Sequence, residues 1–158
     1  MSTTVYKEWM HPGGHLRTMH MPVEIQRLNK TITNHEGVEL IGFWMPNNYA
    51  TGPNLCQFYL VEAALDALEL AQIAVVEEGG SLLLTDAWRS MEQQAEAYKN
   101  KKGIAVSPSQ SNHPKGIAID VTPHDLTQER MEEILAAYGW ARTVPHEPWH
   151  FDYKGELY

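Results

Sequence analysis

Residues 111–120 read Ser-Asn-His-Pro-Lys-Gly-Ile-Ala-Ile-Asp, and they decide how the rest of the chain is interpreted. Between His113 and Asp120 lie a proline and a glycine, which favour a turn, and then an apolar run that predicts a strand over 117–121. Side chains alternate between the two faces of a strand, so the β-branched residues share one face and Asp120 lies on the other. The stretch therefore predicts an aspartate that faces away from the core, with a histidine just before its strand.

A second stretch, residues 147–152, reads Glu-Pro-Trp-His-Phe-Asp. A strand over 149–153 places its three aromatic residues on one face and both His150 and Asp152 on the other. The two predicted strands therefore have the same design, with one buried face and one face that carries metal-binding residue types.

These two strands predict a metal site if they are neighbours, as short connections favour. Asp120 and His150 then converge, and His113 reaches them from the loop. Zinc accepts imidazole nitrogen and carboxylate oxygen, and a catalytic zinc site has three protein ligands and one open position. We predict a single zinc ion at His113, Asp120 and His150. The alternative is that these are three ordinary polar residues with separate hydrogen bonds.

A rival ligand is His146, which forms a His-x-x-x-His pattern with His150. That spacing suits a helix, but Pro145 and Pro148 disfavour a helix at this position. Glu147 is the spare carboxylate and would act as a general base. Its alternative role is that of a surface glutamate before a proline.

Arg89 follows a predicted buried strand over 81–85, at the start of a predicted helix. A guanidinium there can bind a substrate carboxylate through two parallel hydrogen bonds. The alternative is an ion pair with Asp86 or Glu92. Asp152 would orient a zinc ligand, or it would make a simple hydrogen bond at the end of its strand.

The bulk composition indicates one globular domain, because the chain has 158 residues of which 43% are hydrophobic. We expect a catalytic core over 55–155 and an N-terminal arm of unclear role over 1–50. The net charge of −8 argues against a nucleic-acid partner, since phosphate binding needs concentrated Lys and Arg. His11, His15 and His20 look like a metal tract by composition, but the glycine pair between the first two favours a surface arm.

The chain lacks a secretory signal at its N-terminus and a membrane-spanning apolar run, so we expect synthesis in a cytoplasm and no membrane partner. The single cysteine, Cys56, excludes an intrachain disulfide.

Apolar spacing and turn residues predict the remaining elements. They predict a strand over 36–46, a loop from Pro46, a helix over 55–78, a helix over 91–101 capped by Ser90 and Gln93, a helix that begins at Asp125, and a strand over 140–144. This pattern predicts an α+β fold, a small antiparallel sheet with helices packed on one side.

At these motifs the sequence resembles the zinc D-alanyl-D-alanine carboxypeptidase family, which includes VanY-type carboxypeptidases, VanX-type dipeptidases and phage L-alanyl-D-glutamate endopeptidases. The family pattern Ser-x-His-x-x-Gly-x-Ala-x-Asp matches residues 111–120, and Glu-Pro-Trp-His followed by an aromatic and an acid matches 147–152. An upstream Arg-Ser, with Gln five residues after the arginine, matches Arg89, Ser90 and Gln94, with Trp88 in place of the family's tyrosine.

The resemblance covers about residues 55–155 and implies a fold like that of hedgehog-type domains and D-Ala-D-Ala peptidases. It implies zinc at His113, Asp120 and His150, Glu147 as the base, and Arg89, with Ser111, in contact with the substrate. The substrate would be a peptidoglycan stem peptide or muropeptide, cleaved next to a D-amino acid, as by a D-Ala-D-Ala carboxypeptidase or an L-Ala-D-Glu endopeptidase of the endolysin type.

Two alternatives to this reading stay open, a cytoplasmic D-Ala-D-Ala dipeptidase and a non-catalytic zinc-containing binding module. Ser90 and Pro148 oppose the dipeptidase branch, and the presence of Glu147 opposes the binding module. The missing signal favours the dipeptidase, although a lysin that acts on the cell wall explains it as well. The sequence sets no oligomeric state.

Overall fold

A computed structural model describes residues 6–10, 18–22, 24–49, 52–100 and 111–155 of the chain. In chain order the elements are β1 (Tyr6–Met10), β2 (Thr18–Pro22), β3 (Gln26–Thr33), β4 (Glu39–Tyr49), β5 (Gly52–Leu60), α1 (Glu62–Glu77), β6 (Ser81–Asp86), α2 (Met91–Asn100), β7 (Ala118–His124), α3 (Gln128–Ala137), β8 (Trp140–Ala141) and β9 (His150–Tyr153).

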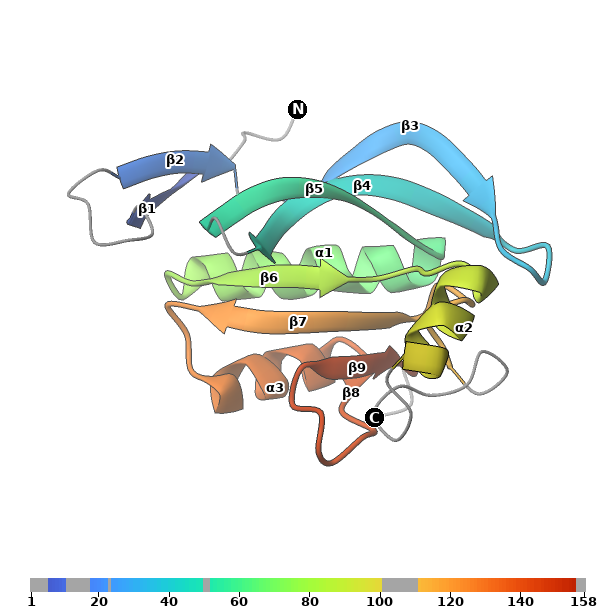
Figure 1. Ribbon diagram of the computed structural model, residues 1–158. Helices are drawn as coiled ribbons and strands as arrows, with labels where there is room; N and C mark the ends of the chain where they lie inside the picture. The colour runs from blue at the N-terminus through green and yellow to red at the C-terminus, as the bar shows by residue number, and fades with distance from the viewer. Residues whose placement is uncertain (1–5, 11–17, 23, 50–51, 101–110, 156–158) are drawn as a thin grey trace.

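Seven of the strands form one sheet, in the order β3-β4-β6-β7-β9-β8, with β5 paired to β4. Neighbouring strands are antiparallel except β4 and β6, which run parallel where Asn47 pairs with Leu84. The predicted α+β class is confirmed, and the sheet is mixed because of this one parallel pair. Strands β1 and β2 form a separate antiparallel pair (Figure 1).

The core lies between the sheet and the helices α1 and α3, which run along one face of the sheet (Figure 1). Helix α1 contributes apolar residues at helical spacing, among them Leu65, Leu68 and Val75, all fully buried. Each such side chain stabilises the fold by about 1.5–3 kcal/mol through its burial. Ile119 and Val121 of β7 also belong to this core, so the predicted apolar face of that strand is confirmed.

The helix predicted over 55–78 is wrong at its start, because residues 52–60 form β5. Burial in this segment alternates, with Phe58 and Leu60 buried and the residues on either side of Phe58, Gln57 and Tyr59, more exposed, which is the period of a strand. The helix itself begins at Glu62. Phe58 therefore reaches the core from the sheet and not from the helix.

Two further boundaries differ from the sequence prediction, and one is confirmed. Pro46 does not begin a loop, since β4 continues to Tyr49 and pairs with β5 along that length. Helix α3 is capped by Thr127, whose hydroxyl accepts a hydrogen bond from the Arg130 N–H, and not by Asp125, which adopts a φ of 54°. The predicted capping box at the start of α2 is confirmed: the Ser90 hydroxyl accepts from the Gln93 N–H, and the Gln93 side chain accepts from the Ser90 N–H.

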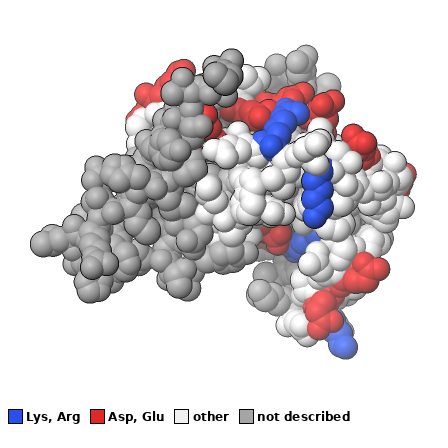
Figure 2. Space-filling view, turned by 90° about the horizontal axis from the view of Figure 1, so that it is seen from above, with Lys and Arg blue, Asp and Glu red and all other residues white. Residues whose placement is uncertain are grey.

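Part of the segment with no assigned role, residues 26–49, forms two strands of the main sheet. His11 and His15 lie outside the described residues, as does the side chain of His20. Within the described parts of the chain, no helix has both the length and the apolar character needed to span a membrane. On the face drawn in Figure 2, Lys and Arg stand singly among acidic and uncharged residues.

Candidate metal centre

One row of polar residues crosses three neighbouring strands on the face of the sheet opposite to the apolar core. In the register of the sheet, Asp86 at the end of β6 lies opposite Asp120 of β7, and Asp120 lies opposite His150 of β9. An irregularity in the pairing between Leu84 and Asp86 aligns the first pair. The predicted convergence of Asp120 and His150 is confirmed, and its cause is the antiparallel pairing of β7 with β9.

His113 reaches this row from the loop that precedes β7. Its ring is almost fully buried, and its Nδ1 lies 2.6 Å from the backbone carbonyl oxygen of Ala87. A carbonyl oxygen can only accept, so Nδ1 carries a hydrogen and donates it. In the neutral ring this leaves the Nε2 lone pair directed toward Asp120.

His150 is oriented in the complementary way. Its Nε2 lies 3.0 Å from Asp152 Oδ1, and its Nδ1 lies 3.2 Å from Asp120 Oδ1. The second oxygen of Asp152 accepts a hydrogen bond from the Thr143 hydroxyl. Asp152 is itself buried, so it fixes the ring through an imidazole–carboxylate contact of the kind that orients histidine ligands of metals.

The spacing of the three groups fits a zinc ion. Asp120 Oδ1 lies 3.3 Å from His113 Nε2 and 3.2 Å from His150 Nδ1, and the three candidate ligand atoms all lie within 4.8 Å of one another. A tetrahedral ion with bonds of about 2.0–2.1 Å separates its ligands by about 3.3–3.4 Å. The buried Nε2 of His113 makes no hydrogen bond, which is costly for a buried polar atom and is resolved if a cation sits beside it.

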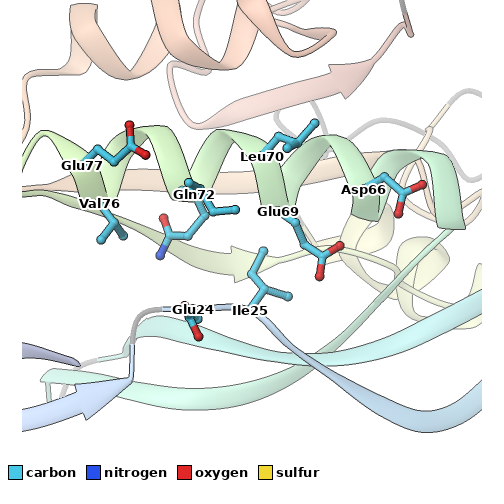
Figure 3. A pocket seen from close by; sticks show the side chains of 9 residues that line it. Glu24, Ile25, Asp66, Glu69, Leu70, Gln72, Val76 and Glu77 are labelled. Atoms are coloured by element: carbon cyan, nitrogen blue, oxygen red, sulfur yellow. The ribbon is translucent and has the colours of Figure 1, made fainter. Parts of the chain in front are cut away.

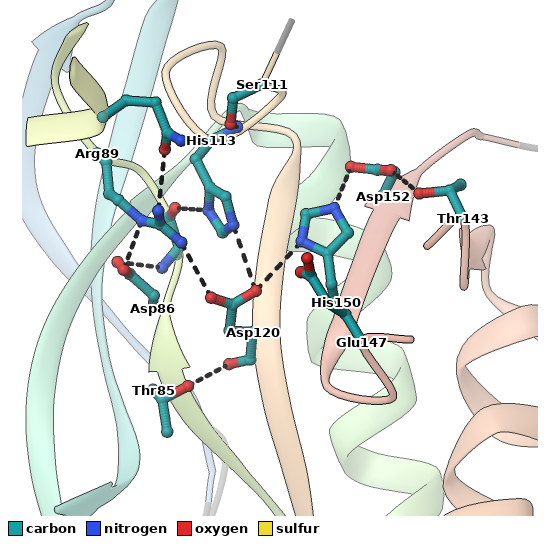
Figure 4. A network of polar contacts seen from close by, with 12 residues as sticks. Thr85, Asp86, Arg89, Ser111, His113, Asp120, Thr143, Glu147, His150 and Asp152 are labelled. Carbon is teal, nitrogen blue, oxygen red and sulfur yellow. Dashed lines mark hydrogen bonds and ion pairs between the residues drawn. The ribbon is translucent and has the colours of Figure 1, made fainter. Parts of the chain in front are cut away.

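Arg89 holds the other oxygen of Asp120. Its guanidinium donates from Nη2 to Asp120 Oδ2 at 3.0 Å and from Nη1 to the Gln94 side chain at 2.9 Å, and its Nε lies 2.6 Å from Asp86 Oδ2 (Figure 4). The ion pair with Asp86, one of the two alternatives raised by the sequence, is therefore present. Because Arg89 engages Oδ2, it leaves Oδ1 of Asp120 facing the two imidazoles.

The electrostatics of the cluster favour positive charge at its centre. Burial opposes ionisation of Asp120, but positive charge on the two imidazoles and on Arg89 outweighs it in the metal-free site and lowers the pKa of this carboxyl well below its usual range. For His150, burial lowers the pKa, because it disfavours the charged ring. The contacts with Asp120 and Asp152 outweigh burial and raise the pKa of His150 to about 9. The pKa of Asp152 falls to about 2, because its contacts with His150 and Thr143 outweigh its burial.

Glu147 lies in the turn that leads into β9, with its side chain 13% exposed. Its backbone carbonyl accepts from the His150 N–H at 3.1 Å, and in Figure 4 its carboxylate points toward the side of the cluster formed by Asp120 and His150. The rival ligand His146 is not part of the three-residue group. Its side chain is 69% exposed, and its Nε2 lies 3.8 Å from Glu147 Oε2.

Ser111 is buried, and its hydroxyl accepts a hydrogen bond from the backbone N–H of His113 at 3.2 Å. The structure thus shows Ser111 shaping the loop that carries His113, and its contact with substrate stays a prediction. Two contributors escaped the sequence prediction: the Ala87 carbonyl, for which no side chain gives a signal, and Thr143, an ordinary threonine by pattern.

A separate hollow of about 610 Å³ runs along α1 beside the start of β3 (Figure 3). It is lined by apolar residues such as Ile25 and Leu70 and by acidic residues such as Glu24 and Glu69. None of the three candidate zinc ligands lines it, so the candidate site rests on the cluster and not on this hollow.

The fold is shared with solved structures of known peptidases, although no model of a known protein family matches the chain and no curated relative does either. The LD-carboxypeptidase LdcB, whose structure addresses peptidoglycan recognition, is 24% identical with a TM-score of 0.56. That alignment covers 63% of this chain and 61% of LdcB.

Two vancomycin-resistance enzymes have the same fold. The D,D-pentapeptidase VanY, solved with Zn(II), is 19% identical with a TM-score of 0.57, over 84% of this chain and 87% of VanY. The D,D-dipeptidase VanXYg, solved with a D-Ala-D-Ala phosphinate analogue, is 20% identical with a TM-score of 0.53, over 71% of this chain and 56% of VanXYg. The chain has the fold of these peptidases. It spans less than two thirds of the length of LdcB and of VanXYg.

Proposed function

We propose that the protein is a zinc-dependent peptidase that hydrolyses a bond next to a D-amino acid in peptidoglycan stem peptides. The observation that carries the proposal is the cluster of His113, Asp120 and His150, in which a hydrogen bond to the second nitrogen of each ring turns the first toward Asp120 Oδ1. The shared fold with LdcB and VanY supports the substrate class.

Zinc held by these three residues would supply a Lewis acid for the scissile carbonyl and would make a water molecule more acidic. Glu147 accepts the proton of that water and passes it to the leaving amine. Arg89 has five N–H groups, of which three are used on Asp86, Gln94 and Asp120. The remaining two can donate to a substrate oxygen, where negative charge develops during acyl transfer.

The test uses Glu147→Gln, which removes the base without changing the three zinc-binding residues. We expect this variant to bind one zinc ion per chain while its hydrolysis of purified muropeptides falls by at least about 100-fold, the lower end of what a general base contributes. Glu77→Gln on α1 is the matched control and should retain activity. A Glu147→Gln variant with near-normal turnover would remove Glu147 from the mechanism.

Mass spectrometry of the products separates the possible bonds. Release of single D-Ala indicates a carboxypeptidase, and hydrolysis of free D-Ala-D-Ala indicates a dipeptidase. Release of a disaccharide that carries only L-Ala indicates an L-Ala-D-Glu endopeptidase. Absence of every product from the zinc-loaded protein would contradict the proposed function and leave the binding module as the reading.

A further inference from the structure

The loop that carries His113 is held from outside by side chains that do not touch the cluster. Asn34, in the turn between β3 and β4, donates from its side-chain Nδ2 to the carbonyl oxygen of Lys115 at 2.9 Å. The indole N–H of Trp88 donates to the carbonyl oxygen of Pro114, the preceding residue, at 3.2 Å. Both contacts reach the two residues that follow the predicted zinc ligand.

The Asn34 contact joins parts of the chain that are 81 positions apart. Asn34 is buried, and its Oδ1 accepts from the backbone N–H groups of Glu36 and Val38 at 2.8 and 2.9 Å. These two bonds fix the side chain within its own turn, so its Nδ2 is already aimed when the loop packs against it. An amide oriented in advance loses little conformational entropy when it makes the third bond.

Trp88 is supported in a comparable way. Its ring packs edge-on against Tyr59 of β5, with centroids 6.2 Å apart, and its backbone N–H donates to the Tyr59 carbonyl at 3.2 Å. The backbone of the loop is bonded to the frame as well, since the Gly116 carbonyl accepts from the Val61 N–H at 3.0 Å and the His113 carbonyl accepts from the Arg89 N–H at 3.4 Å. The carbonyl groups of residues 114, 115 and 116 are therefore all anchored outside the loop.

We propose that Asn34 and Trp88 are positioning residues for the metal site, which set the place of His113 Nε2 relative to Asp120 and His150. The inference rests on the proposed zinc site and gives residues 26–49 a role in it, namely to supply one half of this clamp. A ligand displaced by a fraction of an ångström weakens metal binding, and residues that orient ligands typically contribute 10- to 100-fold to metal affinity.

The decisive variant is Asn34→Asp. The carboxylate keeps the acceptor for Glu36 and Val38, so the turn is retained, but an oxygen replaces the donor and faces the Lys115 carbonyl. The added negative charge would by itself favour a bound cation, so weaker zinc binding cannot be attributed to charge. Trp88→Phe is the second variant: it removes the indole N–H, changes no charge and keeps an aromatic ring near Tyr59.

Gln72→Ala is the control for a general loss of stability. Gln72 is buried and bonds to Ser81 and Leu82 at the start of β6, whereas the metal cluster lies beyond the other end of that strand. We expect this variant to melt at a lower temperature and to bind zinc as the unchanged protein does.

The measurement is the zinc dissociation constant, obtained by competition with a chromophoric chelator at a temperature where circular dichroism shows each metal-free variant folded. Asn34→Asp and Trp88→Phe should each bind zinc at least about tenfold more weakly, and the visible spectrum of the Co²⁺ form should change in both. Unchanged affinity in either folded variant overturns the clamp, and if Asn34→Asp does not fold, Trp88→Phe alone decides. Failure of the unchanged protein to bind zinc would contradict the proposed function instead, which keeps the two failures distinct.

Discussion

Gly116 offers a test of how tightly the metal-binding loop is packed. Its φ is +82°, and a Cβ added there would lie 2.4 Å from Leu40 Cδ2. Leu40 is fully buried, so its methyl group has little room to move away. For Gly116→Ala the left-handed backbone costs about 1–2 kcal/mol, and forcing a methyl group into a packed interior costs about 1–3 kcal/mol.

We therefore expect Gly116→Ala to lower the free energy of unfolding by about 2–5 kcal/mol, and the melting temperature of the metal-free protein by roughly 10 °C. Gly37→Ala is the matched control, since Gly37 has a φ of +81° and nothing within 4 Å of its added Cβ. It should cost only the backbone part, a decrease of roughly 4 °C.

Thermal melting in the presence of a chelator compares the two variants, and a third comparison isolates the contact with Leu40. In a Leu40→Ala background the added methyl group has space, so Gly116→Ala should then cost about as much as Gly37→Ala does. Equal losses for the two glycine variants in the unchanged background would refute the steric argument.

Three further predictions concern the metal centre itself. Asp152→Asn should weaken zinc binding about 10- to 100-fold by removing the carboxylate that orients His150, and unchanged affinity in chelator competition would limit Asp152 to a structural role. Because the pKa of His150 is raised to about 9, its ring is protonated at pH 7 without metal. Zinc binding should therefore release about one proton from this ring, and the affinity for zinc should increase as the pH rises toward 9. Calorimetry in buffers of different ionisation enthalpy measures the number of protons released, and a binding enthalpy that does not depend on the buffer would contradict the prediction. Zinc at about 100 times its dissociation constant should add about 2.7 kcal/mol, raising the melting temperature by roughly 5–11 °C, and a chelator should reverse the rise.

The raised pKa of His150 also makes the stability of the metal-free protein depend on pH. A pKa raised from 6.5 to about 9 means that folding favours the imidazolium. Its contribution to stability is fully present below about pH 6.5 and is lost as the pH rises through about 9.

The strands that carry Asp120 and His150 could be predicted from sequence because alternation is a local property. Ile119 and Phe151 point into the core, so their neighbours along each strand must face the other way. The start of α1 was harder to predict from sequence, since an apolar strand runs directly into an alanine-rich helix. Phe58 fits both the alternation of a strand and the spacing of a helix. The start of α3 was missed for a related reason, because Asp125 and Thr127 both suit a cap and only the backbone conformation distinguishes them.

The surroundings of His113 could not be predicted from any local pattern. Its tautomer is set by a backbone carbonyl, that of Ala87, and every residue has such a group. The contact of Asn34 with Lys115 depends on how a distant turn packs against the loop. Such contacts follow from the tertiary arrangement, which the order of residue types does not reveal.

Because Asp120 pairs with His150 across β7 and β9, metal binding depends on the register of these two strands. If β9 slipped by one residue, Phe151 would stand opposite Asp120 and the imidazole would turn toward the helices. A cation that needs both side chains therefore binds only the register in which Asp120 lies opposite His150, and not a register shifted by one residue. Metal added during refolding should in this way select the native alignment of β9 against β7.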